Sequence, residues 1–185
     1  MEVIFFLIGI IGLIMFIFGM KNLIKIHRHN TIGELKLTET ENEINFEKTG
    51  LYSVCIICGG YANNLGNFDV KIINSGNELE TIEKNSKFKF RHKGRLGTEF
   101  YHFEIKNLGI YKFIFKSIDD IEVKESMLLS KRFFQKKLPI ENIGITVKET
   151  SSSWNFIISL LMAVFGFNIA GWEIILAFNH QIIFK

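Results

Sequence analysis

Cys55 and Cys58 form a C-x-x-C pair, the arrangement in this chain whose chemistry is best understood. Such a pair supports thiol redox reactions at the start of a helix, and two pairs together can hold zinc. Here the pair lies in a segment with strand-like alternation, where residues three apart point to opposite faces. The chain has only these two cysteines. We therefore expect two buried, inert thiols that neither form a disulfide nor bind zinc.

The histidines complete no catalytic motif. They lie at positions 27, 29, 92, 102 and 180, and none has a partner at the i, i+4 spacing of a helix. The sequence also has no G-x-S-x-G motif, no P-loop and no dinucleotide-binding glycine fingerprint. His102 alternates with Phe100 and Glu104 on one predicted strand face, where we expect an exposed or rim residue and not a catalyst. The sequence thus predicts no catalytic residue, no metal and no cofactor.

A glycine- and asparagine-rich segment, residues 59–67, is a candidate binding loop. Its three glycines free the backbone, while Tyr61, Asn63 and Asn64 supply a ring and polar side chains. Function often lies on such loops. The alternative, which we favour, is a wide hairpin connection, because Gly and Asn are turn residues.

Arg91, Lys93 and Arg95 form the densest cationic cluster of the chain. Arginine and lysine in this density bind phosphate or acidic side chains. A solvated turn is the favoured alternative, because exposed charges usually contribute little.

Two apolar segments are long enough to cross a membrane, which takes about 20 residues. Val3 to Met20 holds no charge, and residues 156–178 hold only Glu173. A cleaved signal peptide would need a positive leader and a small-residue cleavage site, and neither is found around the first segment. A buried core helix would be shorter than the second segment. We therefore expect two retained transmembrane helices.

The second apolar segment carries a line of small residues at helical spacing. The line keeps to one side of a helix and contains the single charge of the segment, so it predicts a helix-packing face. One side of this helix can meet the region of Gly9 and Gly12 while the other meets a neighbouring molecule. An intramolecular helix pair, with the Glu173 carboxylate reaching towards the membrane surface, explains the line equally well. The line consists of Ser159, Ala163, Gly166, Ala170, Glu173 and Ala177.

The middle of the chain predicts strands. Alternating segments recur between Gly and Asn residues, without a sustained helical period between 33 and 150. We expect a mainly β fold, an antiparallel β-sandwich or small barrel of eight or nine strands, flanked by an N-terminal and a C-terminal transmembrane helix. The three parts are residues 1–30, 31–150 and 151–185. The expected strands are 34–37, 43–46, 51–58, 67–73, 87–91, 99–105, 110–116, 121–125 and 143–148.

A short internal repeat supports this architecture. Phe46-Glu47 precedes Gly50 and Tyr52, and Phe103-Glu104 precedes Gly109 and Tyr111. In each copy the glycine permits a sharp corner, and the tyrosine can bury its ring while its hydroxyl caps nearby backbone.

Basic residues follow the first apolar segment and precede the second. Because Lys and Arg near helix ends favour the cytoplasm, we expect a cytoplasmic β domain with both termini outside. The same residues are candidates for contact with an anionic membrane surface, although a solvated strand edge explains the second group equally well. They are Lys21, Lys25 and Arg28 in the first group and Lys131, Arg132, Lys136 and Lys137 in the second.

These patterns favour a non-enzymatic integral membrane protein whose β domain binds a partner or ligand. Its helices would associate with each other or with further copies, so the expected partners are the bilayer and this or another membrane protein. The net charge of +3 is too small to indicate nucleic acid. A component of bacterial defence or toxin immunity fits by analogy. The alternatives are a ligand-gated channel effector, with the small-residue line facing water, and a membrane-anchored enzyme.

Overall fold

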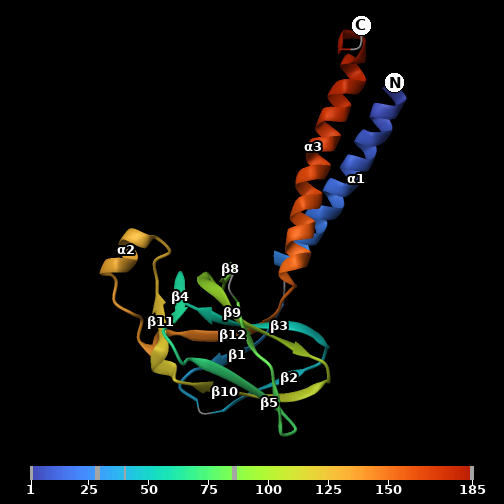
Figure 1. Cartoon of the computed structure of the whole chain (residues 1–185). Coiled ribbons are helices and arrows are strands. Elements are labelled where there is room, and N and C mark those ends of the chain that lie inside the picture. The colour runs from blue at the N-terminus through green and yellow to red at the C-terminus, as the bar shows by residue number, and fades with distance from the viewer. Residues whose placement is uncertain (1, 28–29, 40, 85–86, 184–185) are drawn as a thin grey trace. The chain divides into compact units, whose positions relative to one another are not determined.

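The computed structural model describes the backbone of residues 2–27, 30–39, 41–84 and 87–183 (Figure 1). The chain divides into two compact units. The helical unit contains residues 1–28 and 151–185, and the β unit contains residues 29–150. The chain therefore leaves the helical unit once, completes the β unit, and returns.

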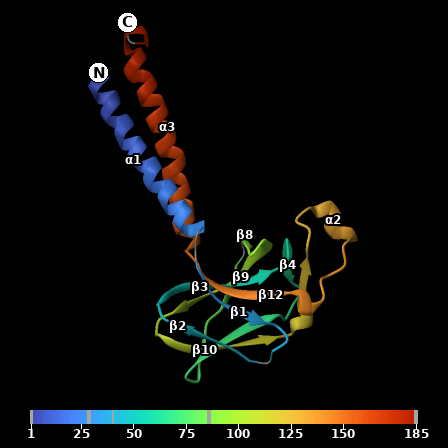
Figure 2. The same ribbon diagram turned by 180° about the vertical axis from the view of Figure 1, so that it is seen from behind.

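The helical unit consists of two antiparallel helices that lie side by side (Figures 1 and 2). They are α1 (Glu2–His27) and α3 (Ser153–Ile183). Both contain spans that are long and apolar enough to cross a membrane, Val3–Ile26 and Ser153–Asn179. Most of their large side chains are exposed in this chain, which suits helices whose outer surface meets lipid.

The β unit is built from antiparallel sheets, and the structure confirms the prediction of a mainly β domain between two long apolar helices. Within the described residues no sheet closes into a barrel. The six-stranded sheet has the order β1-β12-β3-β9-β7, with β8 also paired to β9. Its strands are β1 (Thr31–Lys36), β3 (Gly50–Ile57), β7 (Ile82–Glu83), β8 (Lys89–His92), β9 (Arg95–Ile105) and β12 (Gly144–Glu149).

Two smaller sheets complete the unit. The four-stranded sheet has the order β2-β10-β5-β6, and β11 pairs with β4. Two 3-10 turns and one short helix occupy the connections. These elements are β2 (Asn42–Phe46), β4 (Tyr61–Asn64), β5 (Asp69–Asn74), β6 (Asn77–Leu79), β10 (Gly109–Lys116), η1 (Ile118–Asp120), β11 (Ile121–Lys124), α2 (Leu129–Phe134) and η2 (Ile140–Asn142).

Alternate residues of both larger sheets share one apolar core. Phe46 of β2 lies at its centre, with its ring edge-on to Tyr52, Phe103 and Tyr111. Aromatic pairs of this geometry stabilise a core beyond the area that they bury. The large aromatic side chains of the β unit therefore mainly stabilise its core.

Both predicted tyrosine corners are confirmed. Gly50 and Gly109 have φ angles of 147° and 138°, which L-residues with side chains avoid. The Tyr52 hydroxyl donates to the carbonyl of Lys48 at 2.8 Å, and the Tyr111 hydroxyl donates to that of Asn107 at 2.7 Å. Both rings are 2% exposed.

Three strands and the short helix were not predicted. β4 lies inside the glycine-rich segment, and β6 and β7 are only three and two residues long. The six residues of α2 are too few to show a helical period. Such short elements form because partner strands and adjoining turns satisfy their backbone.

Candidate functional site

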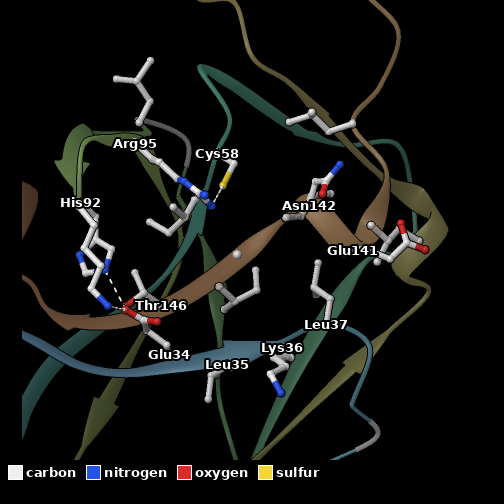
Figure 3. Close-up of a pocket in the computed structure, with 18 of the residues that line it drawn as sticks. Glu34, Leu35, Lys36, Leu37, Cys58, His92, Arg95, Glu141, Asn142 and Thr146 are labelled. Carbon is white, nitrogen blue, oxygen red and sulfur yellow. Dashed lines mark hydrogen bonds and ion pairs between the residues drawn. The ribbon is translucent and has the colours of Figure 1, made fainter.

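A groove of about 1140 Å³ lies on one side of the six-stranded sheet. The hairpin of β8 and β9 forms one wall, and residues 138–143 form the other. Residues 34–38 and the start of β12 form its floor. Figure 3 shows Arg95 and His92 on one side and Asn142 and Glu141 on the other.

A tight turn positions the cationic wall. Lys93 and Gly94 connect the two strands, and both have positive φ angles, 47° and 79°. This backbone is that of a type I′ turn, whose twist suits a two-residue hairpin. The turn places His92 opposite Arg95 and Arg91 opposite Leu96.

The three predicted cations line this groove but do not form one clamp. Lys93 Nζ lies 2.6 Å from Glu34 Oε1, so its charge is paired within the unit. Arg91 and Arg95 belong to adjacent cross-strand pairs, and adjacent pairs project to opposite faces of a hairpin. Only Arg95 therefore brings its guanidinium towards the sheet.

Arg95 donates from Nη1 to the sulfur of Cys58 at 3.4 Å. Among the described side chains it has no carboxylate partner. By contrast, Glu34 at the same end receives hydrogen bonds from Lys93 and His92, and these lower the pKa of its carboxyl. The groove thus keeps one cation available beside a half-buried thiol.

The two thiols differ as their surroundings dictate. Both are free, as predicted. Cys55 is fully buried, and burial raises its pKa to about 12. Cys58 follows the end of β3 with a φ angle of 81°, lines the groove and is half-buried, so the prediction of a buried thiol within the strand was wrong for this residue. Only Cys58 is therefore accessible to a reagent in the folded protein.

The lining of the groove is mixed. On the floor, Leu35 and Leu37 belong to the core and are only 4% and 2% exposed, whereas Glu34, Lys36 and Thr38 are exposed polar residues. Apolar surface comes from the half-buried side chains of Leu96, Leu138 and Ile140. The groove therefore combines some apolar lining with Arg95 at one wall and Glu141 at the other.

A second polar site, which the sequence analysis missed, lies buried on the six-stranded sheet. Glu99 accepts hydrogen bonds from the ammonium groups of Lys84 and Lys148, the latter at 2.7 Å. The Thr150 hydroxyl lies 3.2 Å from the Lys84 ammonium and 3.3 Å from the Glu99 carboxylate. All three charged residues are less than 8% exposed. Burial raises the pKa of Glu99, but the two lysines outweigh burial and lower it.

This cluster joins the groove wall to the strand that precedes α3. The Lys148 ammonium lies 4.0 Å from the ring centre of Phe90, in β8. Thr150 is the last residue of the β unit before the helical unit. The buried cluster therefore contacts Phe90 of the β8–β9 hairpin and includes Thr150, the residue at the end of the β unit.

A β-bulge explains why the faces of β9 were misassigned. The pairing of β3 with β9 shifts between Val54 and Cys55, which leaves Phe100 as the extra residue. Phe100 consequently lies in the core, whereas His102 lies on the other face and is half-buried, so the predicted common face of these two residues was wrong. Burial, followed by the charge of Lys84, lowers the pKa of His102.

A strand occupies the middle of the candidate binding loop at residues 59–67. Tyr61–Asn64 pair with β11, and the ring of Tyr61 lies 4.2 Å from the guanidinium carbon of Arg132. Asn64 donates to the Phe68 carbonyl at 2.8 Å, and Asn63 pairs with Glu122 in the ladder. These contacts support the fold, and the favoured prediction of a wide hairpin connection was wrong for these four residues.

The small-residue line of α3 lies against α1. A Cβ on Gly12 would be 2.6 Å from the Ala170 nitrogen, and one on Gly166 would be 2.4 Å from the Phe16 nitrogen. Gly9 lies opposite Glu173, and Gly19, which the sequence analysis did not single out, lies against Ala163. Ser159, Ala163 and Ala170 are buried, and Ala177 and Glu173 are half-buried.

The predicted membrane-surface residues fall in separate places. Lys21 and Lys25 are exposed on α1, whereas Arg28 lies outside the described residues. In the second group Arg132 is half-buried by its contact with Tyr61. The other three, Lys131, Lys136 and Lys137, are exposed.

No protein family, curated protein or solved structure matches this chain. Within the described residues, no three His, Cys, Asp or Glu side chains lie close enough to hold a metal ion. The candidate site is therefore defined by its own geometry. It is an amphipathic groove with one available guanidinium, supported by a buried ion cluster.

Proposed function

We propose that this chain is a non-enzymatic integral membrane protein whose β unit binds an acidic ligand, or an acidic side chain of a partner, in the groove. The observation that carries the proposal is Arg95, a cation at the groove wall with no carboxylate partner among the described side chains. An acidic group would bind this guanidinium, and an apolar part of the ligand would contact the half-buried Leu96, Leu138 and Ile140. Pockets that combine an apolar lining with a few placed polar groups are typical binding sites.

We further propose that the β unit is a cytoplasmic β-sandwich. The shared core of the two larger sheets supports the sandwich, and the basic residues at its flanks support the orientation. The helices would cross the bilayer as an associated pair. The contact of the small-residue line with α1 favours this packing over a channel, which would need that line to face water.

Cys58 provides a reporter for the groove in the full chain, reconstituted in lipid nanodiscs. An anionic methanethiosulfonate should modify Cys58 faster than a cationic one, because the nearby guanidinium attracts it. Removing the exposed charge closest to Cys58 by Arg95→Gln should lower this rate ratio about fivefold. Lys89→Gln, which removes an exposed cation of the same hairpin outside the groove, should leave the ratio unchanged.

Binding of an acidic ligand in the groove is tested with pyrophosphate. The neutral reagent N-ethylmaleimide measures how fast Cys58 is modified with and without it. Pyrophosphate should slow the modification of Cys58 in the wild type and in Lys89→Gln, but not in Arg95→Gln. Equal rates for both charged reagents in the wild type, or no protection by pyrophosphate, would remove the groove from the proposal.

A further inference from the structure

A cluster of exposed apolar side chains lies on the segment between β11 and η2. We call residues 126–137, which include α2, the α2 lobe. Phe133 is 79% exposed and Phe134 is 92% exposed, and Leu128 and Leu129 are 59% and 62% exposed. Contiguous apolar surface of this kind marks a site of interaction with a protein or a membrane.

The charge of the lobe has one sign. Lys131, Lys136 and Lys137 are exposed, and the sequence from 126 to 140 contains no Asp or Glu. Large apolar residues interspersed with lysine are the composition of segments that lie in the interface of an anionic bilayer. A protein partner would have to cover the four exposed apolar residues and also lie next to these lysines. The lobe has no carboxylate that could orient such a partner.

The lobe is held in place by contacts with β11 and β4 and by a hydrogen bond of its own. The Lys124 ammonium, on β11, donates to the Arg132 carbonyl at 3.1 Å. Within the lobe, the Ser126 amide donates to Gln135 Oε1 at 3.0 Å. Arg132 stacks on Tyr61, so it serves as an attachment of the lobe and not as a lipid contact. The exposure of Phe133 and Phe134 is thus the result of a defined local structure.

We infer that the α2 lobe inserts its apolar side chains into an anionic lipid leaflet. Leu128, Leu129, Phe133 and Phe134 enter the interface, while the three exposed lysines bind lipid phosphates. This inference rests on the membrane anchoring proposed above, but not on the groove. Two spanning helices hold the chain at the bilayer, so even a weak second contact is populated because of its high effective concentration.

The test measures the depth of a nitroxide label by electron paramagnetic resonance in the full chain. The label is attached at Ser130→Cys, an exposed position of α2, with Cys58→Ser to remove the accessible thiol. A second protein carries the label at Lys106→Cys, in the exposed turn after β9. Each is placed in nanodiscs of phosphatidylcholine alone or with phosphatidylglycerol.

With phosphatidylglycerol, the label at position 130 should gain access to oxygen and lose access to a water-soluble nickel complex. The label at position 106 should remain in water in both lipids. Phe133→Ser with Phe134→Ser should return label 130 to water, and Lys136→Glu with Lys137→Glu should abolish the effect of phosphatidylglycerol. A water-exposed label 130 in both lipids overturns the inference, and insertion independent of lipid charge overturns the role of the lysines. Failure of the chain to enter nanodiscs would instead contradict the proposed anchoring.

Discussion

At the scale of single residues, Glu99 is the group on which the buried charge of the β unit depends. It is the shared partner of two buried lysines, Lys84 and Lys148. Removing one member of a buried ion set leaves charges that the interior cannot solvate, typically at a cost of about 3–5 kcal/mol. We expect Glu99→Gln to lower the free energy of unfolding by this amount near neutral pH. Urea titration of the full chain in detergent, followed by the labelling of buried Cys55 in a Cys58→Ser background, measures it.

The stability difference between the wild type and Glu99→Gln should depend on pH. Because the pKa of Glu99 is lowered in the folded state, its contribution is complete above the unfolded value of about 4.3 and is lost as the pH falls towards the folded value. The stability gap between wild type and Glu99→Gln should therefore narrow on acidification. A difference in unfolding free energy that stayed constant from pH 6 to pH 3 would contradict this role of the Glu99 charge. The control Glu104→Gln, at an exposed pair, should stay within about 0.5 kcal/mol of the wild type throughout.

At the scale of elements, the packing of α1 against α3 depends on close backbone approach. Gly166→Ala places a methyl group 2.4 Å from the Phe16 nitrogen, so the helices must separate. We expect a loss of about 1–3 kcal/mol, the usual cost of overpacking. Both tryptophans lie in α3, so their fluorescence during thermal unfolding reports on this pair.

Gly171 offers a matched control in the same helix. Nothing lies within 4 Å of a Cβ added there. Gly171→Ala should leave the unfolding temperature unchanged or raise it, because alanine favours a helix over glycine by about 0.5–1 kcal/mol. Equal effects of the two substitutions would show that helix propensity, and not close packing, governs the pair.

At the scale of the whole molecule, the proposed orientation can be read by chemical labelling in intact cells. Gly66→Cys lies at an exposed, open position of the β unit, and Lys185→Cys marks the C-terminus. In a Cys58→Ser background, a membrane-impermeant maleimide should label position 185 at once. It should reach position 66 only after the cells are permeabilised. The reverse pattern would place the β unit outside.

Local patterns in the sequence determined the features that depend on local physics. The long apolar segments of α1 and α3 can be recognised in the sequence, because a candidate membrane-spanning helix is identified by little more than its length and hydrophobicity. The corners at Tyr52 and Tyr111 can be predicted because each tyrosine follows a glycine by two residues and its hydroxyl donates to a carbonyl only four residues earlier. None of these requires a distant partner.

Only the tertiary structure decided the features that depend on distant partners. Tyr61–Asn64 form a strand because β11, far along the chain, completes their hydrogen bonds. Glu99 is buried with two lysines because a bulge and the covering strands bring them together, and no spacing along the sequence encodes this. The groove beside Arg95 likewise exists only between a hairpin and a turn some forty residues away. Pairing over such separations is set by the competition among all strands for partners, which a local pattern does not contain.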